Sequence, residues 1–186
     1  MDKSYYTIIK IIFIFFLISL TSNIIKNFMI LSYFDEDIKN MVGISSYASL
    51  IIGISFSCIV LVIVSYICYM VIDIFQLNIA LSEFSESFQI FLYFLAIGEL
   101  IKLLLAFLIL DNELSFLVVD ETFLKQFEAT KWFHYNSLVE KCIVPLSAVV
   151  FVFSFKNLGD TKRMRNVIVL SIIILTSVII SSIKWI

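Results

Sequence analysis

The sequence predicts an all-α membrane protein, a polytopic bundle of transmembrane helices, and three observations lead to that prediction. Hydrophobic residues make up 61% of the 186 residues, and the mean hydropathy is +1.06. Charged residues make up 15%, against about 25% in soluble domains. Long apolar runs alternate with short polar segments. Because a soluble domain of this size cannot bury so much apolar surface, the composition excludes a soluble globular chain and a disordered one.

Five apolar runs are candidates for transmembrane helices, with four spans as the alternative. About 20 apolar residues at 1.5 Å each cross a hydrocarbon core of about 30 Å. In the fourth run only Cys142–Phe155 is strongly apolar, so a short span, a re-entrant segment and a buried helix all fit its length. Pro145 is expected in its first turn, where a missing N–H does no harm. The predicted spans are residues 8–31, 47–72, 88–110, 142–158 and 167–183.

Between the third and fourth runs, helical spacing predicts an amphipathic helix over residues 116–135. Phe123 and Phe127 fall on one face of this helix, and Trp132 and Tyr135 follow. Aromatic side chains are enriched at the level of the lipid headgroups, so the four are candidate anchors at the membrane interface. A helix packed on the rest of the protein fits the same pattern.

Basic residues are densest in the short polar turn between the fourth and fifth runs, which carries Lys156, Lys162, Arg163 and Arg165. Short loops rich in Lys and Arg stay on the cytoplasmic side of a membrane, so we expect this turn in the cytoplasm. With five spans, the N-terminus is then cytoplasmic and the C-terminus lies outside. The expected membrane is the inner membrane of a bacterium.

Glu99 and Lys102 lie near the middle of the third run and are its most costly feature. Their i, i+3 spacing places both side chains on one helix face. Each charge at the bilayer centre costs about 2.5–3.5 kcal/mol, so we expect the two to pair and to face protein. An ion pair or partner contact that fixes helix packing, an ion or proton site, and snorkelling toward the interface all remain open.

Small residues recur every four positions in the second run, at Ser45, Ser49, Gly53 and Ser57. This spacing lets two helix backbones approach closely in a membrane. The stripe therefore predicts helix packing, with a neighbour in this chain or in another.

Enzymatic and metal sites are not predicted. His134, Ser137 and Glu140 share a helix face, but the members of a catalytic triad normally converge from separate elements. Asp35 and Asp37 fit a solvated acidic turn better than a cation site. With a single histidine and no glycine-rich phosphate loop, we expect no metal and no cofactor. The net charge of −2 gives no basic excess for nucleic acid.

Three segments follow one another in the second half of the chain. A hydrophilic run, Ser82–Gln89, enters a span; a polar stretch with aromatics, Trp132–Leu138, enters the next; and a basic turn, Lys162–Arg165, leads into the last. In this arrangement the chain resembles the Yip family of five-span, Rab-interacting membrane proteins and their bacterial relatives. The resemblance implies a non-enzymatic membrane organiser or adaptor and assigns no active residue.

Function is predicted only in outline. The sequence favours a non-catalytic integral membrane subunit, an accessory or assembly factor that contacts the lipid bilayer and other membrane subunits through helix packing. A small ion- or proton-coupled transporter subunit that uses Glu99 is the alternative, although four glycines and one proline are few for the broken helices of transporters. An intramembrane enzyme is the least favoured. The sequence does not indicate a substrate or name the partner.

Overall fold

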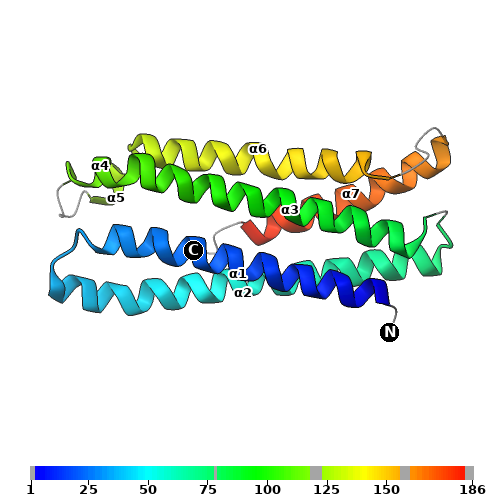
Figure 1. Cartoon of the computed structure of the whole chain (residues 1–186), viewed down its shortest axis with the longest axis horizontal. Helices are drawn as coiled ribbons and strands as arrows, with labels where there is room; N and C mark the ends of the chain where they lie inside the picture. The colour runs from blue at the N-terminus through cyan, green and yellow to red at the C-terminus, as the bar shows by residue number, and fades with distance from the viewer. Residues whose placement is uncertain (1–2, 78, 118–122, 156–159, 183–186) are drawn as a thin grey trace.

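The computed structural model describes residues 3–77, 79–117, 123–155 and 160–182, and every regular element within them is a helix (Figure 1). The all-α prediction is therefore confirmed for this part of the chain. The elements are α1 (Lys3–Leu31), α2 (Glu36–Ile74), α3 (Leu81–Leu105), the π-helical turn η1 (Ala106–Leu110), α4 (Asp111–Leu114), α5 (Phe123–Glu128), α6 (Lys131–Phe153) and α7 (Thr161–Ser182).

Four stretches of helix are long and apolar enough to cross a membrane, so the chain is a membrane protein. They contain or overlap the first four predicted runs. The fourth differs most from its prediction, since it begins well before residue 142, and positions 156–158 lie outside the described residues. The four stretches are Tyr5–Leu31, Val42–Ile74, Leu81–Leu114 and Lys131–Phe153.

α7 corresponds to the fifth predicted run, 167–183, but it is not one of the four candidate spans. Three cations, Lys162, Arg163 and Arg165, occupy its first turns. The remaining helix to Ser182 rises about 24 Å, less than a hydrocarbon core of about 30 Å. In Figure 1, the described part of α7 runs from one end of the bundle to near its middle. Position 183 lies outside the described residues.

α3 occupies the centre of the bundle. It packs against α1 on one side and α6 on the other, α1 packs against α2, and α7 packs against both α2 and α6. We refer to the end of the bundle where α7 begins as the α7 end, and to the opposite end, which holds α4 and α5, as the α5 end (Figure 1).

The larger apolar core lies toward the α7 end and is built on phenylalanines of α3. Phe84, Phe88 and Phe91 are spaced along one helix face, and consecutive rings stack with centroids 5.8 Å apart. Phe151 of α6 meets Phe84 and Phe91 edge-on at 6.2 and 6.3 Å. A smaller core lies toward the α5 end. Its buried members are Ala106, Leu110, Leu114 and Trp132.

The turn between α2 and α3 reverses the chain with a helix C-cap that needs a left-handed residue. Gln76 takes that conformation, with a φ of 45°. Its N–H donates to the carbonyl of Asp73, and the N–H of Leu77 donates to the carbonyl of Ile72. This pair of bonds is a Schellman motif, which satisfies the last carbonyls of α2.

The prediction of one amphipathic helix over residues 116–135 is wrong. α5 covers only six residues, α6 is a separate helix, and positions 118–122 lie outside the described residues. The break has a local cause, because Thr130 takes an extended backbone as the N-cap of α6. Its hydroxyl accepts a hydrogen bond from the N–H of Phe133 at 3.2 Å.

A carboxylate from α4 also caps the start of α6. Glu113 accepts hydrogen bonds from the N–H groups of Lys131 and Trp132, at 3.1 and 2.9 Å. An anion at a helix N-terminus satisfies free N–H groups and opposes the positive end of the helix dipole. The interruption after α5 is thus fixed by specific hydrogen bonds.

The early start of α6 also overturns the expected place of Pro145. The residue lies in the middle of α6 rather than in a first turn. Having no N–H, Pro145 cannot donate to the carbonyl of Lys141, one helical turn earlier. This part of α6 therefore has one fewer backbone hydrogen bond.

Three of the four predicted aromatic anchors pack on the protein itself. Phe123 meets Phe34 at 5.0 Å and stacks on Phe127 at 6.0 Å, and Phe127 lies 5.5 Å from Trp132. These rings cap the α5 end, as the alternative interpretation of a helix packed on protein requires. Tyr135 is 45% exposed. Its role as an interfacial anchor stays a prediction.

The turn between α1 and α2 is tied to α4 by a tyrosine. The hydroxyl of Tyr33 donates to the carboxylate of Asp111 at 2.8 Å and lies 3.0 Å from its carbonyl. This hydrogen bond raises the pKa of the Tyr33 phenol, because it stabilises the protonated form beside a negative charge.

Candidate functional site: a charged cluster inside the bundle

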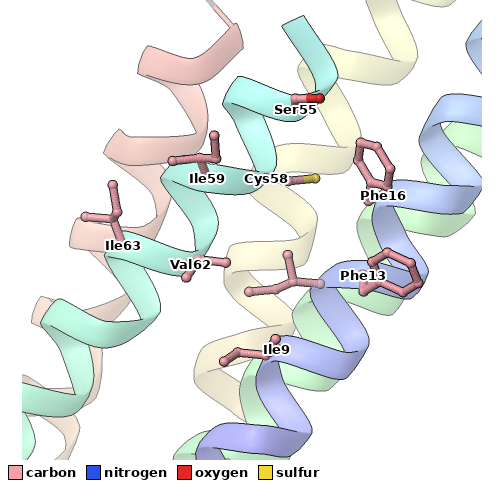
Figure 2. A pocket seen from close by; sticks show the side chains of 9 residues that line it. Ile9, Phe13, Phe16, Ser55, Cys58, Ile59, Val62 and Ile63 are labelled. Carbon is pink, nitrogen blue, oxygen red and sulfur yellow. The ribbon is translucent and has the colours of Figure 1, made fainter. Parts of the chain in front are cut away.

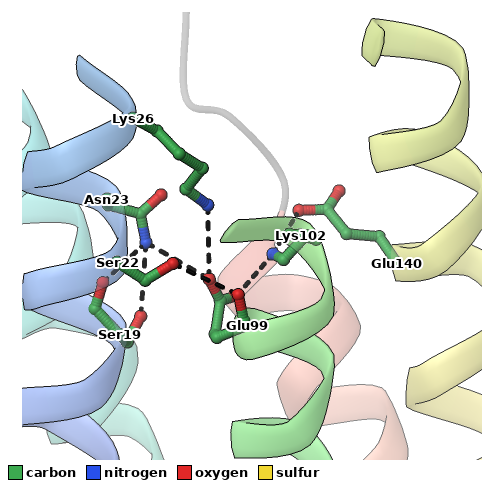
Figure 3. Close-up of polar contacts among 7 residues, drawn as sticks. All are labelled: Ser19, Ser22, Asn23, Lys26, Glu99, Lys102 and Glu140. Atoms are coloured by element: carbon green, nitrogen blue, oxygen red, sulfur yellow. Dashed lines mark hydrogen bonds and ion pairs between the residues drawn. The ribbon is translucent and has the colours of Figure 1, made fainter. Parts of the chain in front are cut away.

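Four charged side chains from three helices meet between the two apolar cores (Figure 3). We call Lys26 of α1, Glu99 and Lys102 of α3, and Glu140 of α6 the charged cluster. Oε2 of Glu99 lies 3.5 Å from Nζ of Lys26, and its other oxygen pairs with Lys102. Nζ of Lys102 also lies 3.1 Å from Oε1 of Glu140. Ion pairs therefore connect α1, α3 and α6.

Neutral polar groups of α1 complete the surroundings of Glu99. Nδ2 of Asn23 donates to the carboxylate of Glu99 at 3.4 Å and to the carbonyl of Ser19 at 2.8 Å. The hydroxyl of Ser22 donates to the backbone carbonyl of Glu99 at 3.2 Å. Ser19, Ser22, Asn23 and Lys26 share one face of α1 because they are spaced by whole turns. That face points at α3 (Figure 3).

The four members of the charged cluster differ in how deeply they are buried. The side chains of Lys26 and Lys102 are each 8% exposed and Glu99 is 14% exposed, whereas Glu140 is 57% exposed. Two ammonium groups and two carboxylates balance in charge. Buried charges are tolerated when such pairing and additional hydrogen bonds offset their desolvation. The arrangement thus keeps three ions away from lipid.

The structure places Glu99 and Lys102 in direct contact and turns both toward other helices. Sequence reasoning missed Lys26 and Glu140 as their partners. Lys26 interrupts the first apolar run, which was a signal, but only the packing of α1 on α3 shows what it meets. The partner of Glu140 likewise depends on the packing of α6 on α3.

A glycine sets the distance between α3 and α6 at this level. A Cβ on Gly98 would lie 2.8 Å from Cγ1 and 3.0 Å from Cγ2 of Ile143. Real Cβ atoms do not approach other atoms so closely, so only glycine fits here. The close approach keeps Glu140 within reach of Lys102.

The structure gives no catalytic arrangement to the histidine on α6. Among the fully described side chains, no hydrogen bond joins His134, Ser137 and Glu140, and His134 is exposed. Within the same part of the chain, no three His, Cys, Asp or Glu side chains gather as metal ligands. The side chain of Asp37 lies outside the described residues.

The small-residue stripe of α2 faces outward. Ser45, Ser49 and Gly53 are exposed, and Ser57 is partly buried with its hydroxyl on the carbonyl of Gly53. A Cβ on Gly53 would meet nothing within 4 Å. Within the described residues, the stripe does not bring another helix of this chain close to α2.

An apolar groove of about 360 Å³ opens between α1 and α2 (Figure 2). No charged side chain lines it, and its least apolar lining groups are Ser55 and Cys58. The groove is separate from the charged cluster and is not suited to an ionic substrate. Its other lining residues are Ile9, Ile12, Phe13, Phe16, Ile59, Val62 and Ile63.

No family model matches this chain, and neither a curated protein nor a solved structure does so. The resemblance to the Yip family therefore stays a prediction from the arrangement of the sequence.

Proposed function

We propose that this chain is a non-catalytic integral membrane subunit that binds another membrane protein along the N-terminal half of α2. The observation that carries the proposal is the outward stripe of Ser45, Ser49 and Gly53, with open space over Gly53. Close approach of backbones over small residues, rather than apolar burial, is what holds helices together in lipid. An accessory or assembly role follows from such lateral binding.

The charged cluster supports the non-catalytic part of this proposal. Each of its four members has an opposite charge within reach inside the chain, so the cluster holds helices together without a ligand. Glu99 is further held by Asn23. A carboxylate engaged in this way holds the helices in position.

We also propose an orientation. The N-terminus of α1, the end of α6 and the cations Lys162, Arg163 and Arg165 all lie at the α7 end. By the preference of Lys and Arg for the cytoplasmic side, this end faces the cytoplasm, in a bacterium across its inner membrane. A crossing by α7 as a fifth span would place the C-terminus outside.

Substitution on α2 tests the proposed binding face. Gly53→Leu fills the space over the stripe, so the partner that co-purifies with the unaltered chain in mild detergent is expected to be lost, as judged by mass spectrometry. Ala48→Leu is the control, because Ala48 is exposed, points about 140° away from Gly53 around the same helix, and gains nearly as much bulk. Equal loss with both variants, or no loss with Gly53→Leu, contradicts the proposal.

A proton- or ion-coupled subunit that uses Glu99 is the second candidate. One observation favours it: η1, a π-helical turn, begins one helical turn after Lys102, and such turns are frequent at functional sites. If Glu99 titrates during transport, Glu99→Gln combined with Lys26→Met abolishes pH-dependent flux in proteoliposomes while the remaining pair of Lys102 and Glu140 keeps the bundle folded. Unchanged flux, or no flux from the unaltered chain, excludes this role.

A further inference from the structure

The outward side of α6 is polar over its first three turns and apolar after them. From Cys142 to Phe153, the exposed side chains of α6 are apolar. Glu140, the one carboxylate of α6, lies apart from the outward side, because it points toward Lys102 of α3 (Figure 3). We call the four polar side chains that are exposed within about 120° of one another the basic face of α6: Lys131, His134, Tyr135 and Lys141.

The basic face lies at a depth where α3 is apolar. The two helices pack in opposite directions, and Gly98 of α3 lies level with Ile143 of α6. Because both helices rise by about 1.5 Å per residue, Phe107 of α3 is level with His134. The exposed side chains of α3 from position 100 to 110 are all apolar, and Asp111 is the first exposed charge after them. They are Leu100, Ile101, Leu104, Phe107 and Leu108.

A flat bilayer cannot suit both helices. If hydrocarbon covers the exposed side chains of α3, it also surrounds the basic face, which extends about 15 Å along α6 from Lys131 to Lys141. Charges at hydrocarbon depth are costly, and the short side chain of His134 cannot snorkel over such a distance. Among the described residues, no carboxylate pairs with Lys131 or Lys141. The basic face therefore needs anions from outside the chain.

We propose that the basic face binds the phosphate groups of anionic phospholipids from the leaflet at the α5 end. The headgroups then lie deeper beside α6 than beside α3, so this leaflet is thinner on the α6 side of the bundle. Local thinning is one way in which a bilayer accommodates charges within a span. The lysine ammonium groups donate charge-assisted hydrogen bonds to phosphate oxygens, and Tyr135 is of a type enriched at headgroup level.

Two features favour a lipid over a protein helix as the occupant. Every polar group of the basic face can donate a hydrogen bond, and a phosphodiester offers oxygen acceptors to all of them. A protein helix would need carboxylates at matching depths, and each of these would be as costly in lipid as the lysines. The basic face is on α6 and the proposed binding stripe is on α2, so lipid binding goes beyond the proposed function.

Thiol labelling in vesicles of phosphatidylcholine and phosphatidylglycerol tests the thinning. Leu138→Cys, within the basic face, and Phe107→Cys on α3 are each made with Cys142→Ser, which leaves only the buried Cys58 and Cys68. Position 138 is level with residue 103 of α3, about 6 Å deeper than position 107. A charged maleimide on both sides of the membrane is nevertheless expected to label Leu138→Cys and not Phe107→Cys. Labelling of both, of neither, or of Phe107→Cys alone contradicts the thinning.

Fluorescence quenching then tests the choice of lipid. A fluorophore on the exposed native Cys142 lies one residue from Lys141. In phosphatidylcholine vesicles, a minor amount of phosphatidylglycerol with brominated acyl chains is expected to quench it more than the same amount of brominated phosphatidylcholine. Lys131→Gln with Lys141→Gln should lower the relative affinity for phosphatidylglycerol at least about tenfold.

Lys162→Gln with Arg165→Gln is the matched control, because it removes two exposed charges at the α7 end and should keep the preference. Equal quenching of the unaltered chain by the two lipids overturns the proposal, and is the result expected if an acidic protein segment occupies the basic face instead. An unchanged preference after Lys131→Gln with Lys141→Gln, or an equal loss with both double variants, also overturns it.

Discussion

Glu99→Gln is expected to destabilise the folded bundle by about 3–5 kcal/mol, the cost of leaving a buried charge without its partner. Lys26 would keep no carboxylate within the charged cluster, and Lys102 would keep only the half-exposed Glu140. Both ammonium groups are 8% exposed, so water cannot replace the lost carboxylate without opening the bundle. Unfolding in mixed detergent micelles, followed by circular dichroism, measures the loss.

Two further variants show whether the effect comes from pairing. Lys26→Met together with Glu99→Gln leaves Lys102 and Glu140 as a balanced pair, so most of the lost stability should return. Lys10→Met removes an exposed cation from the same helix as Lys26, and a surface change of this kind stays within about 0.5 kcal/mol. A loss from Glu99→Gln no larger than that of Lys10→Met would show that the cluster does not hold the helices.

The fold class could be predicted because bilayer physics acts on local composition. A run such as Phe88–Leu110 is apolar over a length that only a helix in lipid can use, and no tertiary information is needed. The residues at which helices begin and end depend also on hydrogen bonds to residues farther away in the sequence. The start of α6 is set by hydrogen bonds to Thr130 and to Glu113 of another helix. The mean hydropathy of the residues around Cys142 contains no information about either contact.

The charged cluster was half predictable for a similar reason. Glu99 and Lys102 lie one turn apart on one helix, so their contact follows from helical geometry alone. Lys26 and Glu140 are far from them in sequence and meet them only through the packing order of α1, α3 and α6. The outward stripe on α2 shows the opposite case, because the spacing of Ser45, Ser49 and Gly53 says nothing about which helix, if any, faces it.

Gly98→Ala is expected to cost about 1–3 kcal/mol, although it changes one hydrogen to a methyl group. The new Cβ would fall 2.8 Å from Cγ1, 3.0 Å from Cγ2 and 3.3 Å from Cβ of Ile143, so α3 and α6 must separate. Gly53→Ala is the matched control. Its Cβ meets nothing within 4 Å, and alanine favours a helix over glycine by about 1 kcal/mol, so that variant should be neutral or more stable.

Because Gly98 precedes Glu99, the separation would also act on the charged cluster. Moving α6 outward lengthens the 3.1 Å contact between Lys102 and Glu140, so Glu140→Gln should cost less in a Gly98→Ala background than in the unaltered chain. Ile143→Ala removes both γ carbons, and with it Gly98→Ala should lose less stability than the two single changes added together. If the losses simply add in both pairs, the glycine does not set the spacing on which the ion pairs depend.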